Sequence, residues 1–240
     1  MEKIYLNKAN ENWILDRLRS EWYRDQATIS TKYVWFSNII WICSPWTWKN
    51  ISKKQLMNKK VVCSIYHIDE AKFSTEDSME FDERDKYVDF YHVISLKTKQ
   101  QLEKLTKKKI ISIPFWVNQD IWFPIENKHG LRSDFNLNKE DYLVGSFQRD
   151  TEGSDMISPK LIKGPDIFLD IVEKIYDTNK NLKVILSGKR RNYLIKNFQN
   201  KNIPYKYFEM VSLETLNKLY NILDLYIVSS RIEGGPQAIL

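Results

Sequence analysis

Apolar and polar residues alternate in blocks along this chain, and the blocks change their period in a regular order. Short, nearly continuous apolar runs are typical of strands that are covered on both faces, as in a parallel sheet. Runs of this kind recur from one end of the chain to the other. The strands they predict are Lys3–Leu6, Asn38–Cys43, Lys60–Tyr66, Val88–Ser95, Lys109–Ile113, Tyr142–Phe147, Leu182–Leu186, Tyr205–Phe208 and Leu223–Val228.

Between these runs, apolar residues recur three or four positions apart, which predicts amphipathic helices. Ile14, Leu18 and Trp22 form one such stripe, and Pro165 suits the first position of another helix. The helices we expect are Glu11–Gln26, Lys97–Lys107, Pro165–Tyr176, Arg191–Phe198 and one that Ser212 caps. Strands that alternate with helices predict an α/β fold with parallel sheets.

Two composition shifts suggest a domain boundary. All seven glycines lie at or after Gly130, and all eight tryptophans lie at or before Trp122. The polar run Glu126–Glu140 lies between the two halves and is interpreted as a linker. We therefore expect domains at residues 1–125 and 141–240. The last predicted strand and loop are followed only by a short apolar stub, so the second domain is expected to be incomplete.

The overall composition, with 42% hydrophobic and 28% charged residues, is that of a globular protein. A net charge of +6 suits an anionic partner such as a nucleotide, nucleic acid or acidic membrane, although a lysine-rich solvated surface explains it equally well. Cys43 and Cys63 lie in apolar runs and are interpreted as buried, and no Cys/His cluster predicts a metal site. The N-terminus lacks the apolar core of a signal peptide, which favours a cytoplasmic location.

In an open parallel sheet, ligands bind beyond the carboxyl ends of the strands, where three groups of residues attract attention. Arg149 and Lys163 flank the loop before Pro165, so they are either a diphosphate clamp at a helix N-terminus or two surface cations among 37. The turn Glu233–Pro236 offers close backbone approach and a carboxylate for sugar hydroxyls, or is an ordinary strand-to-helix turn. The basic run Ser187–Arg191 either faces phosphate or is a solvated helix start.

His67 follows the predicted strand Lys60–Tyr66 directly. A histidine at that position is able to bond a substrate hydroxyl, but a lone histidine is more often a satisfied structural residue. Both interpretations stay open on the residues alone.

The order and spacing of several of these pieces together resemble glycosyltransferase family 4. The resemblance is good from Val61 to Leu240 and poor in the first sixty residues, and it includes Ser95 before a polar helix. The segments that carry it are Ile113–Pro124, Gly145–Arg149, Lys163–Asp166, Leu186–Gly188 and Leu219–Pro236.

This resemblance implies the GT-B fold, with two Rossmann-like domains, and a sugar transfer that retains the anomeric configuration without a metal or other cofactor. The nucleotide-sugar would be a co-substrate, held mainly by the second domain, and the first domain would face the acceptor. By position, Arg149 and Lys163 would hold the donor diphosphate, and Glu233 and His67 would act at the transferred sugar. The other donor-binding residues it implies are Gly234, Gly235, Pro236, Met210 and Val211.

The resemblance also implies partners and a pathway. We expect a glycan or lipid-linked acceptor of unknown identity, in glycan or cell-surface polysaccharide biosynthesis. From the residues themselves, the sequence has no signature of nucleic-acid binding, so no nucleic-acid partner is expected, and the basic charge leaves a peripheral membrane contact as an option. A GT-B epimerase or phosphorylase, or a non-catalytic nucleotide- or RNA-binding module, are the alternatives.

Three features depart from the family pattern. The second glutamate of the family's Glu-x7-Glu motif would fall one position past Leu240, so activity of this form is in doubt. No glycine precedes Gly130, where the family has an N-terminal glycine-rich turn. The insert Asp150–Leu161 lengthens the loop that carries Arg149 and is expected to affect that residue's position.

Overall fold

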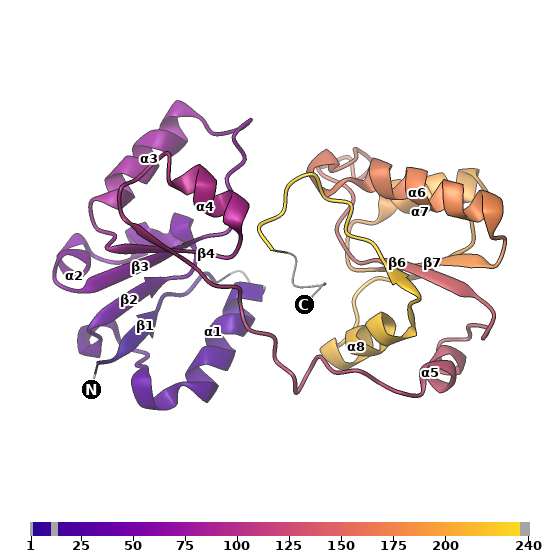
Figure 1. Cartoon of the computed structure of the whole chain (residues 1–240), viewed down its shortest axis with the longest axis horizontal. Helices are drawn as coiled ribbons and strands as arrows, with labels where there is room; N and C mark the ends of the chain where they lie inside the picture. Colours follow the sequence, from indigo (N-terminus) through magenta and orange to yellow (C-terminus); the bar gives the residue numbers. More distant parts are fainter. Residues whose placement is uncertain (1, 11–13, 236–240) are drawn as a thin grey trace. The chain divides into compact units, whose positions relative to one another are not determined.

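A computed structural model describes residues 2–10 and 14–235, which form two compact units (Figure 1). Among the described residues, contacts group those up to Trp116 with Glu233–Gly235 as unit 1, and Val117–Ile232 form unit 2. Each unit contains one parallel sheet with its own hydrophobic core. The expected division at residues 126–140 is a separate matter of domain assignment and stays a prediction.

The sheet of unit 1 has five parallel strands whose spatial order equals their order in the sequence. They are β1 (Ile4–Leu6), β2 (Ile39–Ile42), β3 (Lys60–Ile65), β4 (Phe90–Val93) and β5 (Lys109–Ser112). Each strand falls in an apolar run that predicted it. Because every new strand joins on the same side, the sheet has no point at which the strand order reverses.

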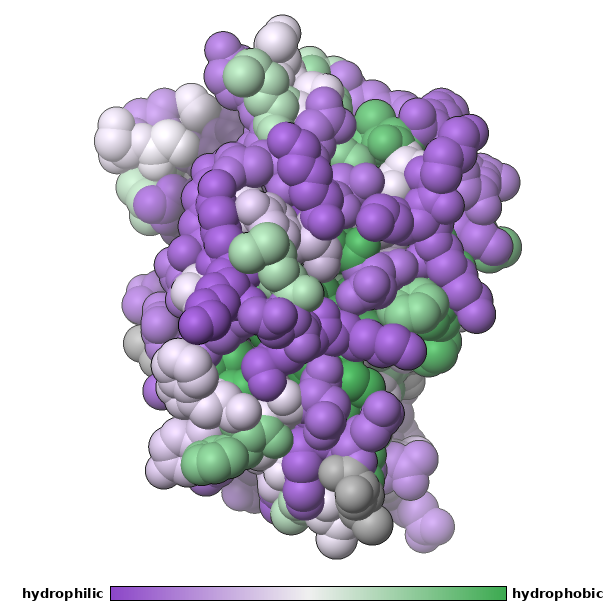
Figure 2. Space-filling view, turned by 90° about the vertical axis from the view of Figure 1, so that its left-hand side faces the viewer, coloured by the Kyte–Doolittle hydropathy of each residue, from purple (hydrophilic) through white to green (hydrophobic). Residues whose placement is uncertain are grey.

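Helices cover both faces of this sheet, with α3 and α4 on the opposite side from α1 (Figure 1). The helices are α1 (Ile14–Asp25), α2 (Lys53–Met57), α3 (Thr75–Asp85) and α4 (Leu96–Leu102). Three short 3₁₀ turns connect the elements, at η1 (Ala27–Ile29), η2 (Val34–Phe36) and η3 (Pro45–Asn50). Figure 2 views the side of unit 1 where β1 begins, and hydrophilic residues dominate that face.

The periodicity did not reveal α3, because its sequence is mostly charged. A capping box starts it: the Ser74 hydroxyl accepts from the Asp77 amide, and the Asp77 carboxylate accepts from the Ser74 amide. The helix buries Phe81 against the core and covers the sheet with little other apolar surface.

The sheet of unit 2 has four parallel strands in the order β8-β7-β6-β9. They are β6 (Tyr142–Ser146), β7 (Leu182–Ser187), β8 (Tyr205–Phe208) and β9 (Leu225–Tyr226). The helices are α5 (Lys128–Asp134), α6 (Pro165–Thr178), α7 (Asn192–Asn200) and α8 (Leu213–Ile222), with a 3₁₀ turn η4 (Leu161–Lys163) before α6. The chain builds outward from β6 to β8 and then returns to place β9 on the other side of β6.

Alternate residues of the central strands of unit 2 face two separate clusters. Val144 and Val184 pack with α6 and α7, whereas Leu143 and Ile185 pack with α5 and α8. The sheet is therefore buried on both faces, which explains why the strands are continuous apolar runs rather than alternating ones.

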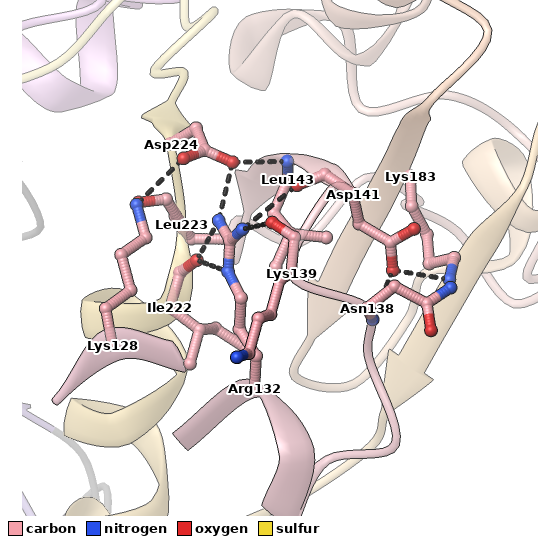
Figure 3. A network of polar contacts seen from close by, with 10 residues as sticks. All are labelled: Lys128, Arg132, Asn138, Lys139, Asp141, Leu143, Lys183, Ile222, Leu223 and Asp224. Carbon is pink, nitrogen blue, oxygen red and sulfur yellow. Dashed lines mark hydrogen bonds and ion pairs between the residues drawn. The ribbon is translucent and has the colours of Figure 1, made fainter. Parts of the chain in front are cut away.

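The segment expected to be a linker contains α5, which is bound into unit 2 (Figure 3). The guanidinium of Arg132 is almost fully buried and donates to the Ile222 carbonyl and to the Asp224 carboxylate, at 2.6 Å for the latter. Asp224 also accepts from the Lys128 ammonium and the Leu143 amide. Lys128 and Arg132 of this run thus belong to a hydrogen-bond network that joins α5 to the starts of β6 and β9, and the role of residues 126–140 as a linker between domains stays a prediction.

Cys43 and Cys63 are free and buried, as expected, and burial raises the pKa of both thiols. None of the described helices is long and apolar enough to cross a membrane.

Candidate functional site

The strand order of unit 2 reverses between β6 and β9, and ligands of open α/β sheets bind at the carboxyl ends of strands at such a point. Gln148 follows β6, and Ser230 follows β9. The Ser230 hydroxyl donates to the Gln148 side-chain oxygen at 3.2 Å, so the two strand ends are joined by polar side chains.

The N-terminus of α6 lies at the same edge and touches the segment after β9. Gly164, the N-cap of α6, has φ 62° and ψ 41°, a left-handed conformation. A Cβ at this position would come 1.9 Å from the carbonyl oxygen of Ser229. The Ser229 hydroxyl in turn donates to the Lys163 carbonyl at 3.2 Å. Only glycine fits where these two backbone segments cross.

Arg231 fastens the segment after β9 to the start of α6. Its amide donates to the Ile162 carbonyl at 3.0 Å, and its guanidinium donates to the Leu161 carbonyl. Both terminal nitrogens also bond the Asp166 carboxylate, at 2.8 and 2.6 Å, a bidentate geometry. The hydrogen bonds from Arg231 hold the pKa of Asp166 below its ordinary value. This ion pair therefore fixes the position of the α6 N-terminus relative to the segment after β9.

Arg149 and Lys163 stand at the two ends of the loop that joins β6 to α6. Arg149 is exposed, and its Nε donates to the Thr151 carbonyl at 2.8 Å. Lys163 is half-buried at the end of η4, and its backbone contacts the strand-end segment through Ser229. Their joint action on a diphosphate stays a prediction, as does their convergence with Glu233.

A buried ion pair lies beneath this loop. Asp150 and Arg191 are almost completely shielded from solvent, with 3.5 Å between a carboxylate oxygen and the guanidinium Nε. Arg191 also donates to the Ser146 carbonyl, the last of β6, at 2.7 Å. Burial raises the pKa of Asp150 to about 6, although the charge of Arg191 opposes the rise. Nε and Nη1 of Arg191 have no hydrogen-bond partner among the described residues.

The insert after β6 is folded rather than loose. Thr151 and Pro159 form an isolated antiparallel bridge, and the amides of Asp150 and Thr151 both donate to the Arg190 carbonyl. The Arg190 guanidinium reaches the Gly153 carbonyl at 3.3 Å. Arg149 is therefore held beside a segment that is tied to the start of α7.

These contacts also change the interpretation of the basic run Ser187–Arg191. Arg191 is fully buried, so the run is not a uniformly solvated helix start. Lys189 and Arg190 line a hollow of about 580 Å³ together with Tyr207 and Glu209. Met210 and Val211, expected near the nucleotide base, directly follow Glu209, and the Met210 side chain is mostly exposed.

In unit 1, His67 follows β3 at the carboxyl edge of the sheet and is exposed. It lines a hollow of about 350 Å³ with Trp46, Tyr66, Asp69 and the largely buried Arg84, among others. Aromatic faces, carboxylates and a guanidinium suit a ligand with many hydroxyl groups. The His67 side chain takes part in this hollow rather than in the core.

Glu233, Gly234 and Gly235 group with unit 1. The backbone of Gly234 lies so close to the carbonyl of Tyr66 that a Cβ would come within 2.0 Å of the oxygen. Gly235 has φ 149°, again within the range that favours glycine. Pro236 lies outside the described residues. Close approach to Tyr66 thus requires glycine at 234 and the backbone conformation favours it at 235, whereas their contact with a nucleotide-sugar stays a prediction.

Sequence reasoning missed Gln148, Ser230, Asp150 and Arg231 as parts of this site. Each of them follows a strand or lies near Arg149 or Lys163 in the structure. The sequence does not show this, because it does not say which strands are neighbours. Among residues 2–10 and 14–235, no three His, Cys, Asp or Glu side chains gather as a metal site would require.

No family model and no curated protein matches this chain. Solved structures do match in fold. HepE from Anabaena, in complex with UDP and glucose, aligns with a TM-score of 0.68 at 12% identity, over 96% of this chain and 74% of HepE. Sucrose-phosphate synthase from Thermosynechococcus elongatus aligns at 0.66 and 16% identity, over 96% of this chain and 59% of the synthase.

The catalytic domain of starch synthase IV from Arabidopsis thaliana, bound to ADP and acarbose, aligns with a TM-score of 0.56 at 14% identity, over 92% of this chain and 56% of that domain. These likenesses, together with two parallel sheets of five and four strands, define the fold as GT-B with Rossmann-like units, as the sequence predicted. The chain spans less than two thirds of the synthases that it matches.

Proposed function

We propose that this chain is a glycosyltransferase of the family 4 type, which moves a sugar from a nucleotide-sugar to a glycan or lipid-linked acceptor with retention of configuration. The observation that carries the proposal is the switch point of unit 2, where Gly164 brings the N-terminus of α6 against the segment after β9. The ligands of the similar structures support a nucleotide-sugar donor: HepE binds UDP, and starch synthase IV binds ADP.

The chemistry of the proposed transfer follows from charge. As the bond between sugar and diphosphate breaks, negative charge grows on the departing diphosphate. The amide groups and dipole of the α6 N-terminus, with Arg149 and Lys163, would stabilise this charge more in the transition state than in the ground state. His67 and Glu233 would contact the transferred sugar. The departing phosphate is able to take the acceptor proton, so the proposal needs no side-chain base.

The donor is tested first by binding. A ligand that binds only the folded chain raises its melting temperature, by an amount that corresponds to about 2.7 kcal/mol at a hundred times its Kd. Thermal shifts with UDP-, GDP- and ADP-sugars would identify the donor, and UDP and ADP are the first to try. A complete absence of shift with all of them would remove the proposal.

Lys163→Ala provides the residue-level test. If Lys163 stabilises the departing diphosphate, its removal should cost about 3 kcal/mol of transition-state stabilisation, measured as kcat/KM for transfer or for hydrolysis of the donor without acceptor. Lys174→Ala is the matched control, because Lys174 is exposed on α6 and forms an ion pair with Asp170 on the same helix. Normal turnover by Lys163→Ala would show that Lys163 does not stabilise the departing diphosphate.

A further inference from the structure

Three large aromatic side chains point into solvent from one short turn at the start of the sheet of unit 1. Tyr33, Trp35 and Phe36, in and beside η2, are 66%, 75% and 73% exposed. Exposed aromatic residues are ordinary when they are scattered, but a contiguous group marks an interaction surface. The structure therefore contains a feature that the donor site does not explain.

The turn is held rigidly, so the display is built into the fold. Val34 points inward and packs against the core of unit 1. The Phe36 amide donates to the Tyr33 carbonyl at 3.1 Å, and their rings make an edge-to-face contact. The Lys59 ammonium donates to the carbonyls of Trp35 and Ser37, which ties the turn to the start of β3. Little backbone freedom would therefore be lost when these rings become buried against a partner.

Lysines surround the aromatic turn. Lys32 precedes it and is exposed, and Lys60 begins β3 and is exposed. The Asn38 carbonyl, directly after the turn, accepts from the Lys60 amide, so Lys60 is adjacent. Among residues 2–10 and 14–235, the structure gives Lys32 and Lys60 no ion pair. The carboxylate of Asp89, which precedes β4, accepts from the amide of Val61 at 2.7 Å. This acid beside Lys60 is thus bound to the backbone.

We propose that this amino-edge surface, formed by Lys32, Tyr33, Trp35, Phe36 and Lys60, docks on an anionic lipid bilayer. Aromatic rings settle at the boundary between headgroups and acyl chains, and lysines beside them bind anionic headgroups. Neither the aromatic rings nor the lysines alone give stable membrane binding, but the two kinds of side chain together do. The net charge of +6 adds attraction at longer range.

The charge distribution favours a bilayer over a second copy of the chain. A two-fold symmetric dimer through this surface would place the lysines of one copy near those of the other, and their repulsion would oppose association. A bilayer of anionic lipids meets the same lysines with opposite charge.

The position of the surface has a consequence within unit 1. In a parallel sheet the strands begin at one edge and end at the other, so this surface lies opposite the carboxyl edge that carries the hollow beside His67. Docking would hold unit 1 on the bilayer and leave that hollow open to water. The inference does not depend on the identity of the donor, and it is tested without any sugar nucleotide.

The test is flotation with vesicles of phosphatidylcholine alone or mixed with phosphatidylglycerol. The chain should float with the mixed vesicles and much less with the neutral ones. Trp35→Ala/Phe36→Ala should reduce partitioning at least about tenfold, the effect of burying one large aromatic side chain. Lys32→Glu/Lys60→Glu should reduce it about fivefold or more per lysine. Met79→Ala, which removes a mostly exposed apolar side chain on α3, should have no effect.

A second readout places Trp35 in the lipid and does not depend on loss of binding. Brominated acyl chains should quench part of the tryptophan fluorescence of the wild type. Trp35→Phe should still float but should lose that quenching. The proposal is overturned if the wild type does not float with anionic vesicles, if the double alanine variant floats equally well, or if Trp35→Phe is quenched like the wild type. It is also overturned if the chain forms a dimer in the absence of lipid and the variant Trp35→Ala/Phe36→Ala is monomeric. A second copy of the chain would then cover the surface.

Discussion

At the residue scale, Gly164 is the position where a single added carbon should do most damage. An alanine there would have to keep a left-handed conformation and would meet the Ser229 carbonyl at 1.9 Å, so the backbone after β9 must move. We expect Gly164→Ala to lower the free energy of unfolding by about 1–3 kcal/mol and to abolish nucleotide binding. Chemical denaturation and calorimetric titration with nucleotide would measure the two effects.

Gly153→Ala is the control for backbone strain. Gly153 also has a positive φ, 72°, but a Cβ there makes only ordinary contacts, the nearest at 3.4 Å. This variant should lose about 1 kcal/mol of stability from the left-handed conformation and keep nucleotide binding. Equal behaviour of the two variants would mean that the approach of Ser229 has no functional role.

The buried pair Asp150–Arg191 predicts a specific pH dependence of stability. Burial raises the pKa of Asp150 from its ordinary value of 3.8 to about 6 in the folded chain. The folded state holds this proton more tightly than the unfolded state does. The stabilising contribution of Asp150 to the free energy of unfolding is therefore fully present below its ordinary pKa. It is lost as the pH rises through about 6. Asp150→Asn should therefore flatten the stability curve between these two pH values, as measured by denaturant unfolding at each pH.

Asp77→Asn is the comparison for this experiment, because the pKa of Asp77 is shifted in the opposite direction. Hydrogen bonds from the amide and hydroxyl of Ser74 hold it below its ordinary value. An unchanged slope in Asp150→Asn would show that Asp150 does not titrate between these pH values in the folded chain.

The same residues show what sequence reasoning was able to find. Arg149 and Lys163 stood out because each lies between a predicted strand and a predicted helix. Gln148 and Ser230 did not, although they meet at the switch point, since their contact joins two strands that are far apart in the sequence. Asp150 looked like part of an insert, and only its burial against Arg191 shows that it is fixed.

At the scale of elements, the strands were predictable because each is covered on both faces and is therefore a continuous apolar run. The helices were less predictable from the sequence. The charged α3 depends on its capping box, and α5 on hydrogen bonds from Arg132 to residues about ninety positions away. The strand order of unit 2 also came only from the structure, because apolar runs do not state which strands are neighbours. The switch point therefore had no signal in the sequence.

The network around Asp224 predicts how strongly α5 is bound to unit 2. Partial burial alone would raise the pKa of Asp224, but hydrogen bonds from Lys128, the Leu143 amide and Arg132 hold it below its ordinary value. Asp224→Asn would leave the buried guanidinium of Arg132 without its anion and should cost about 1.5–3 kcal/mol of stability. Hydrogen exchange should show faster opening of α5, with Asp177→Asn, at an exposed position on α6, as the unchanged control. Equal protection of α5 in both variants would contradict this account.

At the scale of the whole molecule, each unit has its own hydrophobic core, so a ligand bound at the switch point should stabilise unit 2 selectively. Nucleotide would bind where β6, β9 and the start of α6 meet, and local opening of these elements would then require its release. We expect hydrogen exchange with saturating UDP or ADP to slow most at residues 146–150, 162–168 and 227–231. Exchange of β2, β3 and β4 in unit 1 should change little. Protection gained mainly in those strands would place the nucleotide in unit 1 and would contradict the switch point of unit 2 as the donor site.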